Sequence, residues 1–384
     1  MTQTNPPRVT YGELARLFVR LSLTAFGGPV AHIALAQDEI VTRRKWLTHE
    51  HYLDLIAATN LIPGPNSTEV MIHVGYTLRG IPGAILTGVC FITPTFLLTL
   101  ALAILYVSSG TIPAVEALLW GIKPVIVAVI ANAGVRLVPS ALKSPLLWTT
   151  FALAVIAILL GVPEVVAMLG AGLIYALIQV RRSLPTLGAF LFMQAAGSRA
   201  SAFDVFFYFL KIGSVLFGSG YVLIAYIQQD LVNSFKWLSA RELLDAIAIG
   251  QITPGPVSTT ATVVGYIVAG LPGAFAATFG IFLPSFVLVI LTAPLIPRMR
   301  RSRFMSGLLD GVNAGVIAAL LITVLHLASE ALQPLNDVPV TSVVAVVVAL
   351  LALLALVRFR INTTWLILAG AVIGLVMQGI AVSR

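Results

Sequence analysis

Charged residues are scarce in this chain: only 10% of its 384 residues are charged, while 59% are hydrophobic. A typical soluble domain carries roughly 25% charged residues, and a soluble core cannot absorb so much apolar surface. The composition therefore excludes an ordinary soluble protein. The formal net charge of +8 does not indicate nucleic acid, because the basic residues cluster in short loops, as in membrane proteins. We expect the lipid bilayer, and no nucleic acid, as a partner.

Cysteine is almost absent as well. The single Cys90 lies in an apolar run, so one chain can form neither a disulfide nor a cysteine metal site. The sequence also lacks a His/Cys/Asp/Glu cluster at metal-ligand spacing, a phosphate-binding GxxxxGK[ST] motif and a nucleophile elbow. We therefore expect no metal, no cofactor and no enzymatic activity. No signal peptide is evident, because Arg16 and Arg20 interrupt the first apolar stretch.

Long apolar runs are abundant. Many approach or exceed the roughly 18 residues that a helix needs to cross the hydrocarbon core. They cover residues 84–107, 113–135, 146–160, 164–180, 276–297, 304–328, 340–357 and 364–382. The sequence thus predicts an all-α polytopic membrane protein.

The chain contains an internal repeat. Residues 18–65 align without a gap with residues 209–256, and the alignment continues after the loss of one residue. The two copies share Phe26-Gly27 with Phe217-Gly218, Lys45-Trp46 with Lys236-Trp237, Asp54 with Asp245, Pro82-Gly83 with Pro272-Gly273, Pro94 with Pro284 and Gly121 with Gly311. We divide the chain into an N-terminal repeat, a polar cytoplasmic linker and a C-terminal repeat, which cover residues 1–180, 181–203 and 204–384.

Loop charges indicate that the two copies face opposite ways. The run 84–107 is followed by Ser108-Ser109-Gly110-Thr111, whereas its counterpart is followed by four arginines between 298 and 303. Basic loops lie in the cytoplasm, so equivalent loops lie on opposite sides. This is the inverted-topology repeat found in many secondary transporters.

Each copy is predicted to contain an interrupted helix, a re-entrant helical hairpin and about four further transmembrane helices. In the first copy, segments 48–60 and 66–79 are each too short to cross comfortably at about 1.5 Å per residue. Pro63-Gly64-Pro65 lies between them and breaks the helix. A pair of full spans in place of each hairpin is the alternative. Ser239 and Glu242 form a capping-box pattern that starts the second hairpin.

The two Pro-Gly-Pro tips are candidate binding sites. Non-helical backbone at membrane depth is tolerated where it is buried in protein or lines a cavity. A helix begins after each tip, and free N–H groups at a helix N-terminus favour anions. The candidate residues are Gly64, Asn66, Ser67 and Thr68 at the first tip, and Gly255, Ser258 and Thr259 at the second. The alternative is that both tips are structural kinks.

Glycine-rich segments interrupt the first helix of each copy. They are Phe26-Gly27-Gly28-Pro29 and Phe217-Gly218-Ser219-Gly220. Glycine permits unusual torsions and close approach of backbone, so Gly27, Gly28, Gly218 and Ser219 are further candidates for substrate binding. These segments can equally be packing notches, because small residues are common where membrane helices meet.

Ionisable residues inside apolar runs are costly and usually functional. Lys123 lies mid-span and is the leading candidate cation for an anionic substrate. Arg20 aligns with Lys211, and both are either substrate ligands or interfacial residues. Histidine titrates near neutral pH, so His32, His73 and the acidic Glu69 are candidates for proton coupling. Each of these three can instead bond a neighbouring helix.

Several segments carry a family resemblance: FGGPVAHI at 26–33, Pro65 with Gly75 ten residues on, GIPGA at 80–84, WGIKPVIVAVI at 120–130, PGPVSTTATVVGY at 254–266 and LLDGVNAGVIAAL at 308–320. In these segments the chain resembles the chromate transporter (CHR) family in its long two-domain form. The resemblance implies a multi-pass protein of the bacterial inner membrane that exports chromate and confers chromate resistance, driven by protons or by exchange with sulfate.

Three alternatives to chromate export remain open from the sequence. They are a carrier of sulfate or another oxyanion, a passive anion channel, and a membrane scaffold or sensor that transports nothing. Sequence does not settle the oligomeric state, and a homodimer is the expected one because closed two-fold assemblies are the commonest.

Overall fold

The described part of the chain is built from helices alone. The computed structural model describes residues 9–26, 28–59, 62–109, 112–180, 200–217, 220–294, 303–335 and 338–382. The first half contains α1 (Tyr11–Thr24), α2 (Pro29–Gln37), the π-helix η1 (Asp38–Arg43), α3 (His49–Thr59), α4 (Asn66–Ser109), α5 (Pro113–Ala141), α6 (Pro145–Leu159) and α7 (Glu164–Val180). The second half contains α8 (Ala202–Val215), α9 (Val222–Ile227), the π-helix η2 (Gln228–Ser234), α10 (Ala240–Ile252), the 3₁₀ turn η3 (Val257–Thr259), α11 (Thr260–Thr292), α13 (Arg303–Ala331), α14 (Pro339–Arg358) and α15 (Thr363–Val382).

The repeated sequence folds twice into the same succession of elements. Helix α1 corresponds to α8, α3 to α10, α4 to α11, and α5 to α13. Backbone torsions repeat as well: Lys45 and Lys236 both have φ of 54°, and Gly80 and Gly270 both have φ of 63°. Side-chain caps recur at helix starts, with capping boxes at α1, α8 and, as predicted from Ser239, α10. The aligned residues therefore specify one local structure twice.

Helices α4 and α11 are each folded back on themselves at a kink. Helical torsions fail at Arg79 and Gly80 in α4, and at Ala269 and Gly270 in α11. The chain reverses at the first kink. This is shown by Thr87, beyond the kink, whose hydroxyl donates to the carbonyl of Met71, before the kink, at 2.9 Å. Helix α4 is thus a short arm of residues 66–79 followed by a long helix of residues 81–109. The long helix is about 43 Å at 1.5 Å per residue, enough to span a bilayer.

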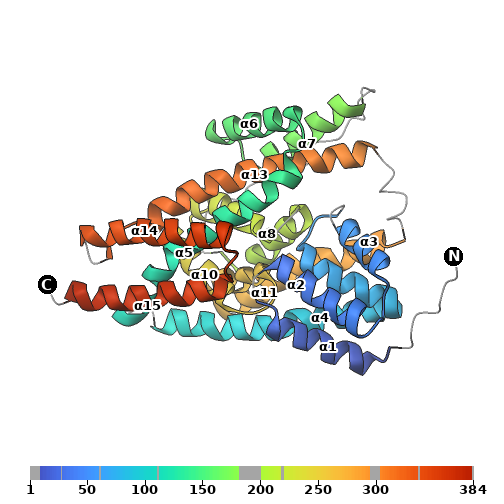
Figure 1. Ribbon diagram of the computed structural model, residues 1–384, viewed down its shortest axis with the longest axis horizontal. Coiled ribbons are helices and arrows are strands. Elements are labelled where there is room, and N and C mark those ends of the chain that lie inside the picture. Colours follow the sequence, from blue (N-terminus) through green and yellow to red (C-terminus); the bar gives the residue numbers. More distant parts are fainter. Residues whose placement is uncertain are drawn as a thin grey trace.

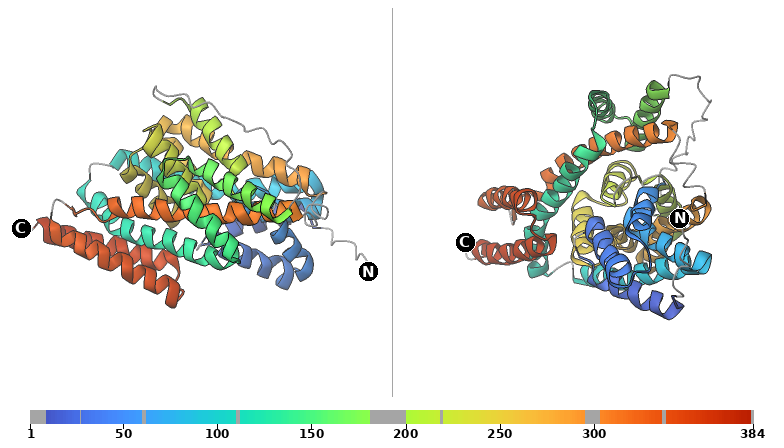
Figure 2. Two further views of the ribbon diagram at one scale, coloured as in Figure 1. Left: turned by 90° about the horizontal axis from the view of Figure 1, so that it is seen from above. Right: turned by 45° about the vertical axis from the view of Figure 1, so that its right-hand side comes forward.

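The two halves are interlocked. Helix α5 of the first half packs against α14 and α15, whereas α13 of the second half packs against α6 and α7 (Figures 1 and 2). Both crossings use small residues, which let helices approach closely. A Cβ atom on Gly121 would overlap the backbone of Gly370 and Gly374, and one on Gly311 would overlap Ala171 and Gly172. The last two helices of each half therefore cover the other half.

Equivalent helices of the two halves run in opposite directions. Near the end of α5, Lys143 lies 3.5 Å from Asp310, near the start of α13. Near the start of α5, the Trp120 indole donates to the carbonyl of Gln333, just after α13, at 3.0 Å. Helices α4 and α11 are also antiparallel. Gly88 of α4 faces Phe286 of α11, while further along α4 the ring of Phe96 lies 5.0 Å, centroid to centroid, from that of Phe275.

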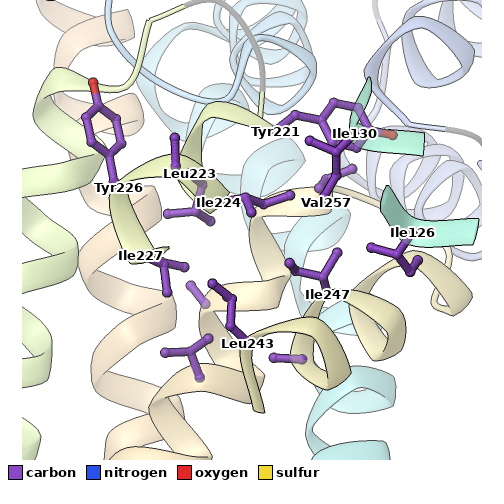
Figure 3. Packing of buried hydrophobic residues seen from close by; sticks show 14 of the residues in the cluster. Ile126, Ile130, Tyr221, Leu223, Ile224, Tyr226, Ile227, Leu243, Ile247 and Val257 are labelled. Atoms are coloured by element: carbon purple, nitrogen blue, oxygen red, sulfur yellow. The ribbon is translucent and has the colours of Figure 1, made fainter. Parts of the chain in front are cut away.

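Apolar side chains cover the outside as well as the core. Around α9, Leu223, Ile224, Leu243, Ile247 and Ile126 from three elements pack together in the interior (Figure 3). In contrast, the outer helices present exposed leucines to their surroundings. Five helices of the described part are long and apolar enough to cross a membrane, and α6, α7 and α15 are shorter apolar helices. The prediction of an all-α membrane protein is confirmed.

Candidate functional site

The two Pro-Gly-Pro tips are joined to the broken helices of the opposite halves. The Gly64 N–H donates to the carbonyl of Leu216, which caps the end of α8, at 2.6 Å. The Gly255 N–H donates to the carbonyl of Ala25, which caps the end of α1, at 3.0 Å. These reciprocal bonds bring both tips and both helix breaks, four features that the sequence singled out separately, into one region.

Only glycine fits at either tip. Gly64 and Gly255 have φ of 149° and 95°, torsions that residues with a Cβ rarely adopt. A Cβ atom on Gly64 would overlap Glu69 and Ser285, and one on Gly255 would overlap the hydroxyl of Thr95. Each tip is therefore packed against a hydroxyl carried by the long helix of the other half.

Thr95 and Ser285 were missed from the sequence. Each directly follows a proline of the repeat, Pro94 or Pro284, so they occupy equivalent positions. Both are buried, and Thr95 also shares a hydrogen bond of 2.8 Å with Ser22 of α1. The sequence could have indicated them, because a hydroxyl residue follows the aligned proline in both copies within an otherwise apolar run.

The hydroxyls that follow the tips are buried. Ser67, Thr68, Ser258 and Thr259 are each at most 2% exposed. Thr259 donates to the Pro256 carbonyl at 2.8 Å. The hydroxyls of Thr68 and Ser258 have no hydrogen-bond partner among the residues that the structure describes. Buried polar groups are normally paired, so these two unpaired hydroxyls are exceptions, and their role in substrate binding stays a prediction. Asn66 begins α4 and is half-buried.

His32 connects the first break to the first hairpin. Its Nε2 lies 3.1 Å from the Ala25 carbonyl and its Nδ1 lies 3.3 Å from the Ser67 hydroxyl. A carbonyl only accepts, so Nε2 carries the proton, and in the neutral ring Nδ1 accepts from Ser67. The Ala25 carbonyl therefore receives hydrogen bonds both from His32 and from the second tip.

Glu69 and His73 lie one turn apart on the first arm of α4, and both are at most 1% exposed. Glu69 and Ser285 of the second half both lie against Gly64, because a Cβ atom there would overlap both side chains. Neither carboxylate oxygen of Glu69 has a hydrogen-bond partner among the described residues, and the same holds for His73 Nε2. All three proton-coupling candidates thus lie on the elements around the first tip.

Lys123 has a protein partner. Its Nζ lies 3.2 Å from Asp245 Oδ1, with both side chains less than 10% exposed, and Tyr106 donates to Asp245 Oδ2 at 2.9 Å. Asp245 lies seven residues before the end of α10 at Ile252, about 10 Å along the helix axis. Lys123 is therefore neutralised at the base of the second hairpin, and the structure does not bring it into contact with the tips. Its role as a substrate cation stays a prediction.

Arg20 and Lys211 form equivalent ion pairs. Arg20 lies 3.5 Å from Glu39 of η1, and Lys211 lies 3.5 Å from Asp230 of η2. Each pair joins residues 19 positions apart in the chain, which would lie about 28 Å apart if the helix continued through the break. The chain therefore reverses at each break, so the predicted interrupted helix is a second helical hairpin and not one crossing helix. The side chains are 58% and 28% exposed, which agrees better with the interfacial alternative than with a buried ligand. Glu39 and Asp230 were not singled out from the sequence.

The glycine-rich breaks are described in part. Gly27, Gly218 and Ser219 lie outside the described residues. Gly28 has φ of 81° and precedes α2, which starts with Pro29. A Cβ atom on Gly28 would lie 3.1 Å from the Tyr221 hydroxyl of the other half. No group of three His, Cys, Asp or Glu side chains in the described ranges could hold a metal ion.

The fold and this interior define a class: a multi-pass α-helical membrane protein whose two copies bring helix ends and buried hydroxyls into a common interior. The family model described as Chromate transporter matches residues 12–176 and again residues 203–375. The chain belongs to the chromate transporter family, in its long form with two copies of the domain, as the sequence motifs predicted.

Similar proteins extend over most of the chain. A chromate transport protein of Cupriavidus metallidurans is 31% identical over 96% of this chain and 94% of its own length. A chromate transport protein of Pseudomonas aeruginosa is 30% identical over 85% of this chain and 83% of its own length. A probable chromate transport protein of Synechococcus elongatus is 27% identical over 87% of this chain and 88% of its own length. No solved structure gives a significant match.

Proposed function

We propose that the chain is a secondary active transporter that exports chromate across the bacterial inner membrane by alternating access, and so confers chromate resistance. The observation that carries this proposal is the reciprocal pair of hydrogen bonds from Gly64 to Leu216 and from Gly255 to Ala25. Each joins a hairpin tip of one half to the helix break of the other. A movement of one half against the other must break or remake both bonds, which is what alternating access requires.

An inverted repeat with re-entrant hairpins supports this mechanism. The antiparallel course of α5 against α13 and of α4 against α11 agrees with opposite orientations of the two halves. Helix α3 has 11 residues, so it is about 16 Å long, roughly half of the hydrocarbon thickness. In this proposal both hairpins enter from opposite faces and their tips meet near the midplane.

Chromate is a tetrahedral dianion, and the tips offer what such an ion binds. Helix N-termini with free N–H groups begin after each tip, and the hydroxyls of Thr68 and Ser258 are buried without a described partner. Lys123 would join the site in another conformation by exchanging Asp245 for the substrate. Glu69, His32 and His73 would carry the coupling proton, because the first half supplies all three while the aligned positions of the second half hold no titratable side chain.

The test is counterflow of labelled chromate in proteoliposomes with purified wild type, Lys123→Ala and the double variant Lys123→Met/Asp245→Leu. Removing one member of a buried ion pair costs about 3–5 kcal/mol of stability, whereas an apolar replacement of both is often tolerated. We expect the double variant to fold as well as wild type and to lose chromate counterflow. Full counterflow in the folded double variant would remove Lys123 from the substrate path.

Sulfate carriage and a passive channel are the alternatives, since sulfate has the same shape and charge. Labelled sulfate in the same vesicles separates the first, because a sulfate carrier would prefer it over chromate. A channel would show fast flux that ignores imposed pH and counter-anion gradients. The similar proteins from Cupriavidus metallidurans and Pseudomonas aeruginosa are named chromate transport proteins, which favours chromate.

A further inference from the structure

A pocket of about 350 Å³ lies beside the first helix break. Phe26 and Pro29 of the break line one side, Asn132 and Arg136 of α5 line another, and the turn between α14 and α15 closes it with Arg360. Tyr221 of the second break also lines it. The pocket is several times larger than the roughly 30 Å³ that one water occupies in the liquid, so it has room for a small hydrated ion.

The charged residues that line this pocket are both cationic. Its lining includes Arg136 and Arg360 and no acidic residue. Neither arginine forms an ion pair with an acidic side chain in the part of the chain that the structure describes. Arginine presents planar donors that match oxyanions. Lys123, Arg20 and Lys211, by contrast, each form an ion pair with an acidic side chain.

A buried amide points to a missing ligand. Asn132 is only 7% exposed, yet its Oδ1 has no hydrogen-bond partner among the described residues. An asparagine side chain can turn its amide so that either end faces the pocket. Turned toward the pocket, the amide N–H2 of Asn132 would donate to a bound oxyanion beside the two arginines, and a water in the pocket would donate to Oδ1.

Arg360 adopts an uncommon backbone torsion. It has φ of 53°, whereas the corresponding turn between α6 and α7 uses Gly161 at φ of 89°. A non-glycine residue in this region carries a conformational cost and is often found at functional sites. Arg360 adopts this unfavourable torsion and also lines the pocket.

The two pocket residues of α5 are not repeated at the aligned positions of α13. The repeat register of 121 with 311 places Ile322 opposite Asn132 and His326 opposite Arg136. Leu160, Gly161, Val162 and Pro163 form the turn that corresponds to the one with Arg360, and they carry no charge. The arginine and asparagine lining is therefore a feature of the pocket beside the first break and is not part of the repeated sequence.

We propose that this pocket is an entry site that captures a tetrahedral oxyanion dianion from the cytoplasmic side before it reaches the tips. The side follows from the basic end of α5, where Arg136 lies near the end of the helix and Lys143 lies just after it, because basic helix ends and loops belong in the cytoplasm. The way inward is short, because Tyr221 lies against Gly28 and the adjacent Ala25 is bonded to the second tip. The inference rests on the proposed function and gives that transport a cytoplasmic start.

Equilibrium binding of labelled sulfate and chromate tests the site in the purified full chain, held in phosphatidylcholine nanodiscs. The variants are Arg136→Gln and Arg360→Asn, since asparagine tolerates the same backbone torsion. Arg358→Gln is the matched control at the end of α14, outside the pocket lining. Loss of one charge-assisted contact should weaken binding about tenfold or more, with no change for the control.

A second measurement assigns the side. In proteoliposomes with the protein in one orientation, both pocket variants should raise KM for chromate offered at the face of Arg136, with kcat unchanged, and leave KM from the opposite face as in wild type. Equal binding and equal KM in variants and wild type would overturn the inference.

Two further outcomes are informative. If anionic phosphatidylglycerol in the nanodiscs competes fully with the oxyanion in wild type but loses this effect in the pocket variants, the pocket is a lipid headgroup site and the inference fails. If wild type binds oxyanion in an arginine-dependent way but transports none, the entry site stands and the proposed transport fails.

Discussion

The two Pro-Gly-Pro tips have the same backbone and very different surroundings. Each tip glycine has a positive φ, and its N–H donates to the broken helix of the other half. Each also packs against a hydroxyl on the long helix of that half. Around the first tip lie His32, Glu69 and His73, but the equivalent positions of the two histidines hold Leu223 and Val263. The duplication has therefore preserved the scaffold, while these three titratable side chains occur in the first half and have no titratable counterparts at the aligned positions of the second. Three experiments can break or sharpen this comparison.

The largest effect is expected from Gly255→Ala and Gly64→Ala. Each adds a methyl group where a hydroxyl already lies, and each forces an unfavourable torsion. Overpacking of this kind costs about 1–3 kcal/mol, and the torsion adds about 1–2 kcal/mol. We expect both variants to lower thermal stability in detergent and to abolish chromate transport.

A matched rescue tests the contact between the halves. Thr95→Ala removes the hydroxyl that faces Gly255, so the double variant Thr95→Ala/Gly255→Ala should regain part of the lost stability. The same Thr95→Ala change should not rescue Gly64→Ala. Rescue of both glycine variants, or of neither, would contradict the cross-half packing.

An intermediate effect is expected from Glu69→Gln. Glutamine keeps the size of the side chain but cannot carry a proton, so transport should lose its response to an imposed pH gradient while the protein stays folded. The control is Thr260→Val, because Thr260 follows Pro256 by four residues as Glu69 follows Pro65. This control should keep the response. A normal pH response in Glu69→Gln would end the proposal that the first tip carries the proton.

The smallest effect on activity is expected from cysteine labelling, which tests whether the halves are inverted. In a Cys90→Ser background, single cysteines replace Ser109 and Ser302, which follow equivalent runs of the repeat. We expect transport close to wild type and labelling of the two positions by an impermeant reagent from opposite sides of the membrane. Labelling from the same side would overturn the inverted arrangement.

The family, the membrane class and the places where helices break could all be read from residues. Apolar runs, Pro63-Gly64-Pro65 and the glycine-rich segments act locally, because proline removes a donor and glycine permits torsions that other residues avoid. The partners of the charged residues could not be read in this way. Lys123 was an unpaired cation in the sequence, and Asp245, which lies 122 residues further along the chain, became its partner only through packing.

Local sequence, then, determined that this chain is a duplicated helical membrane protein whose helices break at two glycine-rich segments and at two Pro-Gly-Pro motifs. Tertiary structure alone decided that each tip binds the break of the opposite half, that Thr95 and Ser285 cover the tip glycines, and that Arg136 and Arg360 meet at one pocket. The physical reason is the range of the interactions. Helix breaks depend on torsions of neighbouring residues, whereas these contacts join positions far apart in the chain and exist only once the two halves interlock.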